Sequence, residues 1–90
     1  MSENMMVMES LDMLIKAVRK YYDELQMNKK ILQDAANVCE AAMGSDDNVK
    51  KHIARLNDVL EKLERTATVA ENVAEGLMIE KQNALYTYED

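Results

Sequence analysis

The sequence predicts an all-α protein that folds as an antiparallel two-helix hairpin. Apolar residues recur at the three- and four-residue spacings of a heptad repeat on both sides of Gly44, and the chain contains no proline. At the middle of the chain Gly44 is followed at once by Ser45, Asp46 and Asp47. Glycine ends helices, whereas serine and aspartate begin them. We therefore expect a single helical-hairpin domain over residues 1–90.

The first helix is expected over about residues 3–43. Its apolar positions repeat every seven residues, and further apolar side chains fill the intermediate positions, as is typical of a helix that pairs along one stripe. Asn28 and Lys29 interrupt the stripe once. The repeat consists of Leu11, Val18, Leu25, Leu32 and Cys39, with Leu14/Ile15, Tyr21/Tyr22, Ala35/Ala36 and Ala42/Met43 between them.

The turn is expected at residues 44–46 and the second helix over about residues 47–87. Only Lys81 lies out of pattern in the second stripe. Additional apolar residues widen this stripe beyond what one neighbouring helix covers, so we expect a second contact. The stripe is formed by Val49, Ile53, Leu56, Leu60, Leu63, Ala67, Ala70, Ala74, Leu77 and Ala84, and is widened by Val59, Val69, Val73, Met78 and Leu85.

Folding the chain back at the turn places residue i opposite roughly residue 90 − i. This register sets large side chains opposite small ones and opposite charges near one another, which favours it over a slipped alternative. The predicted neighbours are Tyr21 and Tyr22 with Ala67 and Ala70, Ala35 and Ala36 with Ile53 and Leu56, and Lys29 and Lys30 with Asp58 and Glu61.

The acidic balance of the chain limits its partners. The net charge is −6, with five basic against seven acidic residues in 1–45 and six against ten in 46–90. Neither half offers the positive surface that nucleic acids and acidic membranes require. No apolar run approaches the roughly 18 to 20 residues of a membrane span. We predict no nucleic-acid binding and no membrane span.

The N-terminal residues and the single cysteine indicate the compartment in which the chain is made. The single cysteine cannot form an internal disulfide, so the fold does not depend on an oxidising compartment. The apolar N-terminal residues Met5–Met8 lack a basic region before them and a small-residue cleavage site after them. We expect synthesis in the cytoplasm and no cleavable signal peptide.

Catalytic chemistry has little support in the sequence. Cys39 and His52 fall close together in the hairpin register, but a nucleophilic thiol needs an orienting group and a pocket that excludes water, which two helices do not enclose. A zinc ion there would lack two ligands unless a second chain supplied them. The carboxylates form no pair at a cleft, and there is no glycine-rich phosphate loop. We predict no enzyme activity, no catalytic residue, no cofactor and no metal.

The chain ends in Tyr86-Thr87-Tyr88-Glu89-Asp90. Tyr86 and Asp90 are four residues apart, which places an aromatic and a charged group on one helical face. One interpretation is a recognition patch, and the other is a solubilising tail without a specific role.

With the central glycine and this ending, the whole chain resembles the WXG-type family, small helical hairpins exported by type VII secretion systems of Gram-positive bacteria and mycobacteria. Two helices of similar length, the turn at Gly44 and the Tyr-x-x-x-Asp/Glu sequence of Tyr86 and Asp90 carry the resemblance. The chain departs from the family at the turn, where Ala42-Met43-Gly44 stands in place of Trp-x-Gly. In this respect it is similar to the divergent small helical partners of type VII polymorphic toxins.

The resemblance implies a secreted bacterial protein that acts through dimerisation. It implies a homodimer or heterodimer with a similar hairpin, packed as a four-helix bundle, or binding to the helical N-terminal domain of a toxin. It also implies that Tyr86 and Asp90 form part of the export signal read by a secretion ATPase. We expect the dimer interface at Val59, Val73 and, in the Met-rich N-terminal turn, Met8.

Two alternatives remain open from the residues themselves. The first is a cytoplasmic chaperone or adaptor of another secretion or flagellar system, which would hold an exported helix and stay behind. The second is a structural subunit of a helical assembly built by repeating one hairpin contact.

Overall fold

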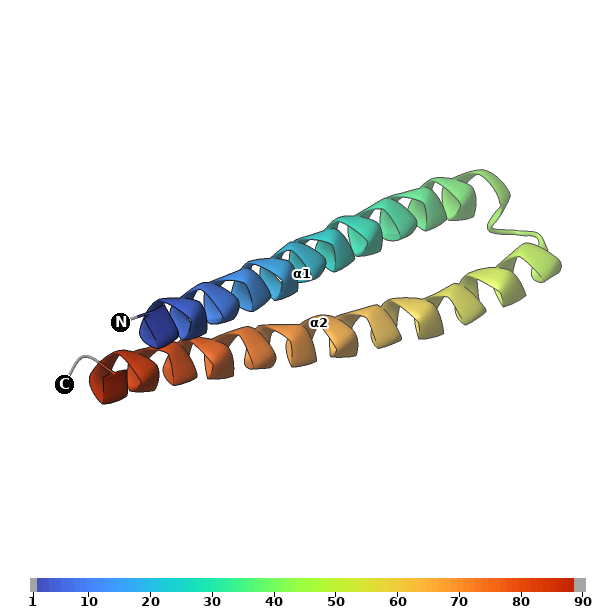
Figure 1. The fold of residues 1–90 in the computed structure, drawn as a ribbon. Helices are drawn as coiled ribbons and strands as arrows, with labels where there is room; N and C mark the ends of the chain where they lie inside the picture. The colour runs from blue at the N-terminus through green and yellow to red at the C-terminus, as the bar shows by residue number, and fades with distance from the viewer. Residues whose placement is uncertain (1, 89–90) are drawn as a thin grey trace. The chain divides into compact units, whose positions relative to one another are not determined.

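The computed structural model describes the backbone of residues 2–88 and the side chains of residues 6–85. Two helices, α1 (Ser2–Met43) and α2 (Asp47–Tyr88), are joined by a three-residue turn (Figure 1). Residues 2–88 contain no strand. The predicted all-α helical hairpin is confirmed, and the expected ranges of about 3–43 and 47–87 lie within one residue of these bounds.

Asp46 organises the start of α2. Its Oδ1 accepts hydrogen bonds from the backbone N–H groups of Asn48 at 2.9 Å and Val49 at 3.1 Å. These N–H groups lie in the first helical turn and have no partner within the helix, so Asp46 is the N-cap. The N–H of Asp46 itself donates to the carbonyl oxygen of Met43 at 3.0 Å, which closes the turn. Asp47 then adds a negative charge at the positive end of α2.

Position 44 requires glycine because a side chain would not fit there, and not because the backbone is left-handed. No glycine within residues 2–88 has a positive φ. A Cβ at position 44 would instead collide with the carbonyl oxygen of Glu40, one turn earlier in α1. Any other residue at this position would therefore have to displace the end of α1. The turn lies at 44–46 as expected, but the glycine acts through a close approach.

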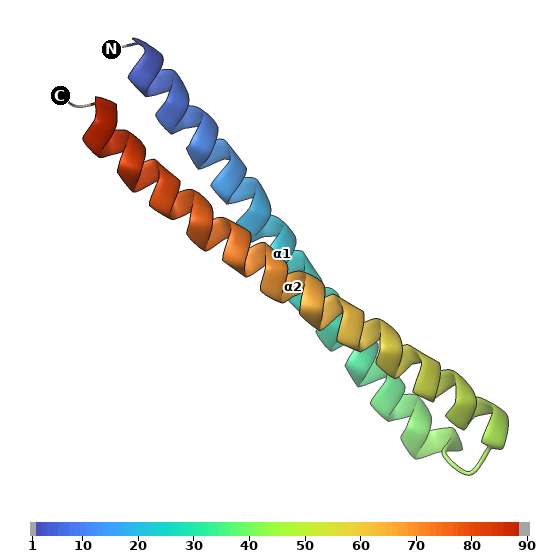
Figure 2. The same ribbon diagram turned by 90° about the horizontal axis from the view of Figure 1, so that it is seen from below.

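Contacts divide the chain into two compact units, each pairing a segment of α1 with an antiparallel segment of α2. The terminal unit consists of Met1–Tyr22 with Thr68–Asp90, and the turn unit is Asp23–Ala67. Figure 2 shows that each helix continues without a break from one unit into the other.

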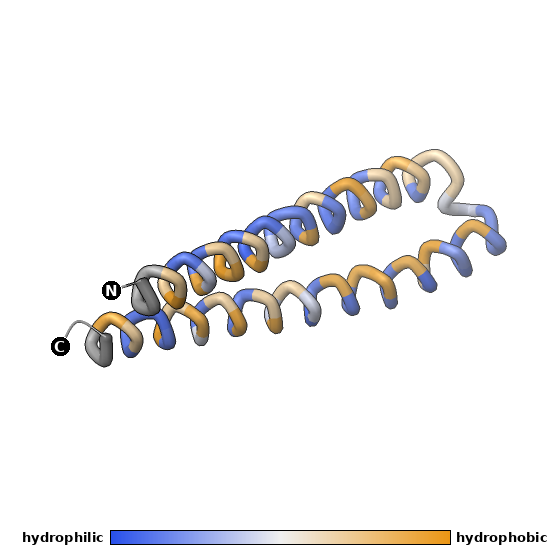
Figure 3. The backbone as a smooth tube through the Cα atoms, viewed as in Figure 1, coloured by the Kyte–Doolittle hydropathy of each residue, from blue (hydrophilic) through white to orange (hydrophobic). Residues whose placement is uncertain are grey.

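The seam between the helices follows heptad positions a and d. In α1 these are the rows of Ile15 (a) and Leu25 (d), and in α2 the rows of Ala67 (a) and Ala70 (d). Hydrophobic residues recur along both helices at this spacing (Figure 3). Within residues 6–85, all buried side chains occupy a or d, namely Ile15, Leu25, Ala67, Ala70, Ala74 and Ala84.

The two units pack their seams differently. In the terminal unit Ile15 is buried together with three alanines of α2, and small side chains let two helices approach closely. In the turn unit Leu25 and Ala67 are buried, and none of residues 26–66 is. Its seam is built from larger residues that are only half-buried, including Leu32, Ile53, Leu56, Leu60 and Leu63.

Several residues predicted for the stripe lie outside the seam. Leu14, Tyr21 and Ala35 are exposed, whereas Ile15 is buried and Tyr22 is half-buried. Because the heptad repeat directs only positions a and d at the partner helix, one member of each adjacent pair must point to the flank. Tyr21 therefore lies on the flank with half of its surface exposed, and Tyr22 is the member of this pair at a seam position. Cys39 has the right spacing, yet it is exposed near the turn.

One predicted charge pairing is also shifted. The ammonium group of Lys29 pairs with the carboxylate of Glu64, one turn beyond the expected Glu61. A shift of about one turn keeps the same helix face directed at the partner, so the apolar stripe alone does not resolve it.

Candidate interaction surface

The two flanks of α1 differ sharply in polarity. Heptad positions g and c lie on one side of the seam, and positions e and b on the other. From residue 7 to residue 42, Glu24 is the only charged residue at g and c, whereas every residue at e and b is polar. The g and c rows include Val7, Ser10, Leu14, Ala17, Tyr21, Ile31 and Val38, and the e and b rows include Glu9, Asp12, Lys16, Arg19, Asp23, Lys30 and Glu40.

The flanks of α2 repeat this asymmetry in weaker form. The apolar residues at positions g and c are Val59, Val69 and Val73, and Gly76 lies between the last of these and Glu80. Positions e and b are mostly charged up to Glu75, with Ala54 as an exception, and Met78 and Leu85 are apolar.

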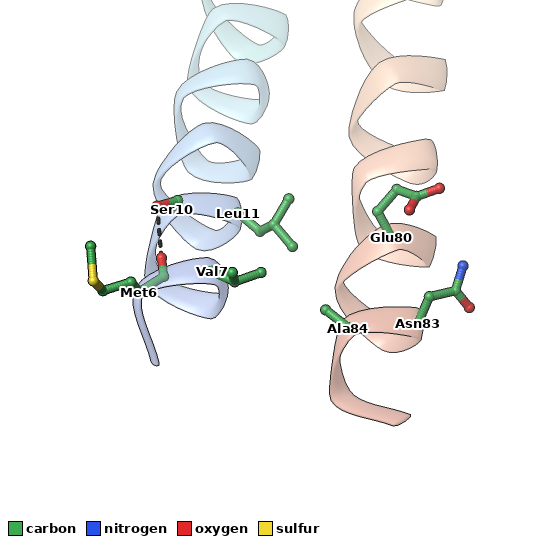
Figure 4. A pocket seen from close by; sticks show the side chains of 7 residues that line it. All are labelled: Met6, Val7, Ser10, Leu11, Glu80, Asn83 and Ala84. Atoms are coloured by element: carbon green, nitrogen blue, oxygen red, sulfur yellow. Dashed lines mark hydrogen bonds between the residues drawn. The ribbon is translucent and has the colours of Figure 1, made fainter. Parts of the chain in front are cut away.

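The g flanks of both helices lie on the same side of the terminal unit. Two antiparallel right-handed helices present corresponding flanks to the same side. An open groove of about 710 Å³ is lined by Val7 and Ser10 of α1 with Glu80 and Asn83 of α2 (Figure 4). A groove of about 360 Å³ is lined by residues of the e and b rows of both helices, including Asp12, Lys16, Arg19, Met78, Gln82 and Leu85.

We call the g and c side of the terminal unit its open face. Leu14 and Tyr21 of α1 are 49% and 50% exposed there, and Val69 and Val73 of α2 are 61% and 45% exposed. Figure 4 shows the end of this face, where Val7 and Leu11 project toward α2. These exposed side chains lie outside the seam and belong to one contiguous flank, which is the pattern of an interaction surface.

The turn unit has an open face on the corresponding flanks. Its exposed apolar residues are Ile31 and Val38 of α1 and Val59 of α2. Arg55 and Lys62 of α2 lie in the same rows together with Glu24 of α1, so this face carries charges of both signs. The open face of the terminal unit instead carries Glu80.

Gly76 is unusual in the open face of the terminal unit. It lies inside α2, and a Cβ added there would meet nothing within 4 Å. A glycine in a helix interior costs about 1 kcal/mol relative to alanine. No neighbour in the chain therefore requires its small size.

One ion pair crosses the seam in each unit, on the charged side. Lys81 Nζ lies 2.5 Å from Asp12 Oδ1 in the terminal unit, and Lys29 pairs with Glu64 in the turn unit. Both lysines occupy position a and both acids position e. A polar residue at a single a position fixes helix register at a cost in stability. The pairs therefore define the alignment of α1 with α2 and are no ligand site.

The residues predicted for the dimer interface lie in different environments. Val59 and Val73 are exposed on the open faces, whereas Met8 is half-buried at position a in the seam. Tyr86 lies within α2, but its side chain is outside the described part, and Asp90 lies outside the described residues altogether.

The described residues provide no metal site. Cys39 and His52 are both exposed, and no group of three or more His, Cys, Asp and Glu side chains in this part of the chain could hold a metal ion. Neither α1 nor α2, as far as the structure describes them, has an apolar window long enough to cross a membrane.

The structure thus shows a helical hairpin in which one flank of α1 is mainly apolar and the other is polar. Comparisons with models of known families, with curated proteins and with solved structures found no match for this chain.

Proposed function

We propose that the protein is a non-enzymatic substrate or partner protein of a type VII secretion system that acts by forming a four-helix bundle with a similar hairpin. The observation that carries the proposal is the open face. A two-helix chain buries only a thin seam, and the apolar flanks of Leu14, Tyr21, Val69 and Val73 stay in water unless a partner covers them.

The charged side supports the same arrangement. Positions e and b of α1 carry only polar residues, so one side of each unit is suited to solvent and the other to a partner. A second helical hairpin is the simplest partner for the open face, because helices with heptad repeats pack against one another at small crossing angles in four-helix bundles. The partner is either a second copy or a related hairpin, such as the helical N-terminal domain of a toxin.

The export part of the proposal depends on the chain end. Tyr86 and Asp90 are assigned as the signal read by a secretion ATPase, on the strength of the resemblance to the WXG-type family and of their four-residue spacing. The protein would be made in the cytoplasm and exported without a cleavable signal peptide.

The test is secretion in the native host of a Tyr86→Ala/Asp90→Ala variant. We expect export to be abolished, while the intracellular amount of the protein stays unchanged. The matched control is Tyr88→Ala/Glu89→Ala, which removes the same residue types without touching the four-residue pair. Continued export of the first variant would contradict the signal assignment.

The same open face also supports a second candidate function, a cytoplasmic chaperone or adaptor that holds an exported helix. Absence of the unmodified protein from the culture medium, together with its capture of a secreted helical protein inside the cell, would favour this candidate. Open-ended polymers in light scattering would instead favour a structural subunit of a helical assembly.

A further inference from the structure

We propose that the charged side of the terminal unit binds a small amphipathic anion, that is, a carboxylate or phosphate head group on a short apolar chain. The site is the groove of about 360 Å³ between the e and b rows of α1 and α2, which we call the cationic groove. Every residue of its described lining belongs to the terminal unit. The site lies on the flank opposite the open face and does not depend on the proposed function.

The cationic groove offers two positive charges that no ion pair neutralises. Lys81 is paired with Asp12, whereas neither Lys16 nor Arg19 forms an ion pair with a carboxylate of the described side chains. The groove on the open face differs, because Glu80 is the only charged residue of its described lining. Although the net charge of the chain is −6, an anion is therefore attracted to the cationic groove and repelled from the other one.

The guanidinium group of Arg19 has a weak hydrogen-bond partner. Its Nη2 atom donates to the Sδ atom of Met78 at 2.9 Å, a contact that joins α1 to α2 within the groove. A thioether is a poor acceptor, whereas a carboxylate or phosphate accepts two parallel hydrogen bonds from a guanidinium group. An anionic head group therefore replaces the sulfur atom as the partner of Arg19. Lys16, three residues earlier on the same flank, adds a second positive charge.

The groove also provides an apolar wall for the chain of the ligand. Ile15 contributes to the lining from the seam, and Met78 and Leu85 are 42% and 36% exposed. Met78 and Leu85 are seven residues apart in one row of α2, a span of about 10 Å that an extended octanoate chain covers. An aliphatic chain along this row removes apolar surface from water.

The size of the groove favours a small ligand. Its volume of about 360 Å³ lies at the lower end of the range for small-molecule sites, roughly 300–1,000 Å³. The lining combines apolar side chains with a few charged groups, which is the composition of such sites. The head group is therefore expected at Arg19 and Lys16, with the aliphatic chain directed toward Leu85.

A titration of the isotope-labelled full chain with octanoate, followed by two-dimensional NMR, tests the location of the site. We expect the signals of Arg19, Met78 and Leu85 to shift until the site is saturated. Octyl phosphate should shift the same signals, and the tighter of the two ligands identifies the preferred head group. Shifts centred on Val7 and Ala84 instead would place the ligand in the groove of the open face and overturn the assignment.

Two further probes separate the head group from the chain. Octyltrimethylammonium has the same chain with the opposite charge, and inorganic phosphate has the charge without a chain. Neither should shift the signals of the cationic groove at the concentrations that saturate it with octanoate. Equal binding of the cation would overturn the role of charge, and equal binding of inorganic phosphate would overturn the role of the apolar wall.

Substitution of the arginine tests the head-group contact. Arg19→Gln should weaken octanoate binding about 10-fold, because the charged hydrogen bonds to the carboxylate are lost. Lys20→Gln is the matched control, since it removes the same charge at the outward position f of α1, and it should change the affinity by less than about twofold. Equal losses in the two variants would show that net charge alone attracts the ligand and would overturn the site.

Substitution of the leucine tests the apolar wall. Leu85→Ser should weaken octanoate binding about threefold, because part of the buried apolar area is lost. Ile79→Ser is the matched control at the outward position f of α2, where the isoleucine is exposed, and should leave the affinity unchanged. Circular dichroism checks that each variant remains helical. An affinity that is insensitive to Leu85→Ser would contradict the assigned position of the chain.

Discussion

The terminal unit and the turn unit follow the same heptad plan with different side chains. In the terminal unit Ile15 and three alanines of α2 are buried in the seam. In the turn unit only Leu25 and Ala67 are buried, and the leucines and the isoleucine at seam positions of residues 26–66 are half-buried. The exclusion of water from the seam thus decreases toward the turn, although the apolar side chains there are larger.

The largest expected effect contrasts two apolar residues of the α1 seam. Ile15→Ala should lower the free energy of unfolding by about 2–4 kcal/mol, since Ile15 is buried in the seam and the change leaves a cavity. Leu32→Ala in the turn unit should cost about 1 kcal/mol, because Leu32 is already half-exposed. Urea denaturation followed by circular dichroism at one fixed protein concentration measures both. Equal losses would show that the seams are packed alike.

The second pair of variants enlarges one alanine in the seam of each unit. Ala74→Leu should lower the free energy of unfolding by about 1–3 kcal/mol, since the alanine is buried in the seam and a larger side chain there displaces its neighbours. Ala36→Leu is the matched change in the turn unit, where the alanine is half-buried, and should stay within about 0.5 kcal/mol. Thermal unfolding of both variants makes the comparison. Tolerance of Ala74→Leu would contradict close packing of the terminal unit.

The hairpin and its turn could be predicted because their signals are local. Gly44 with Ser45, Asp46 and Asp47 marks one break in an otherwise helical sequence, and the structure places the N-cap at Asp46. Why position 44 requires glycine could not be predicted, since the collision with the Glu40 carbonyl depends on the path of the turn. The register was harder to predict, because a shift of about one helical turn preserves the stripe, and the ion pairs of Lys29 with Glu64 and of Lys81 with Asp12 reveal it.

Only some of the residues of the interaction surface could be predicted from the sequence. Val59 and Val73 stand out because they break the narrow stripe of α2. Leu14 and Tyr21 were missed because each lies beside a seam residue, Ile15 or Tyr22, and adjacent apolar residues look like one broad stripe. Assigning strict a and d positions would have separated them, since a 3.5-residue period admits only one residue of each pair to the seam.

The third prediction concerns the cap that holds the turn unit closed. Asp46→Ala should cost about 1 kcal/mol, because the N–H groups of Asn48 and Val49 lose their acceptor. Asp46→Asn keeps a side-chain oxygen and should retain most of the stability. Ser45→Ala is the neighbouring control and should change the free energy of unfolding by less than about 0.5 kcal/mol. A larger loss from Ser45→Ala than from Asp46→Ala would identify the wrong cap.

The smallest effect concerns the glycine inside α2. Gly76→Ala should raise the free energy of unfolding by about 0.5–1 kcal/mol, since the added methyl group meets nothing within 4 Å and alanine favours the helix. Asn72→Ala, at the outward position f of α2, is the control that gains helix propensity alone. Thermal unfolding at one fixed protein concentration measures both variants. A loss of stability in the Gly76→Ala chain would show that the added methyl group meets a neighbour.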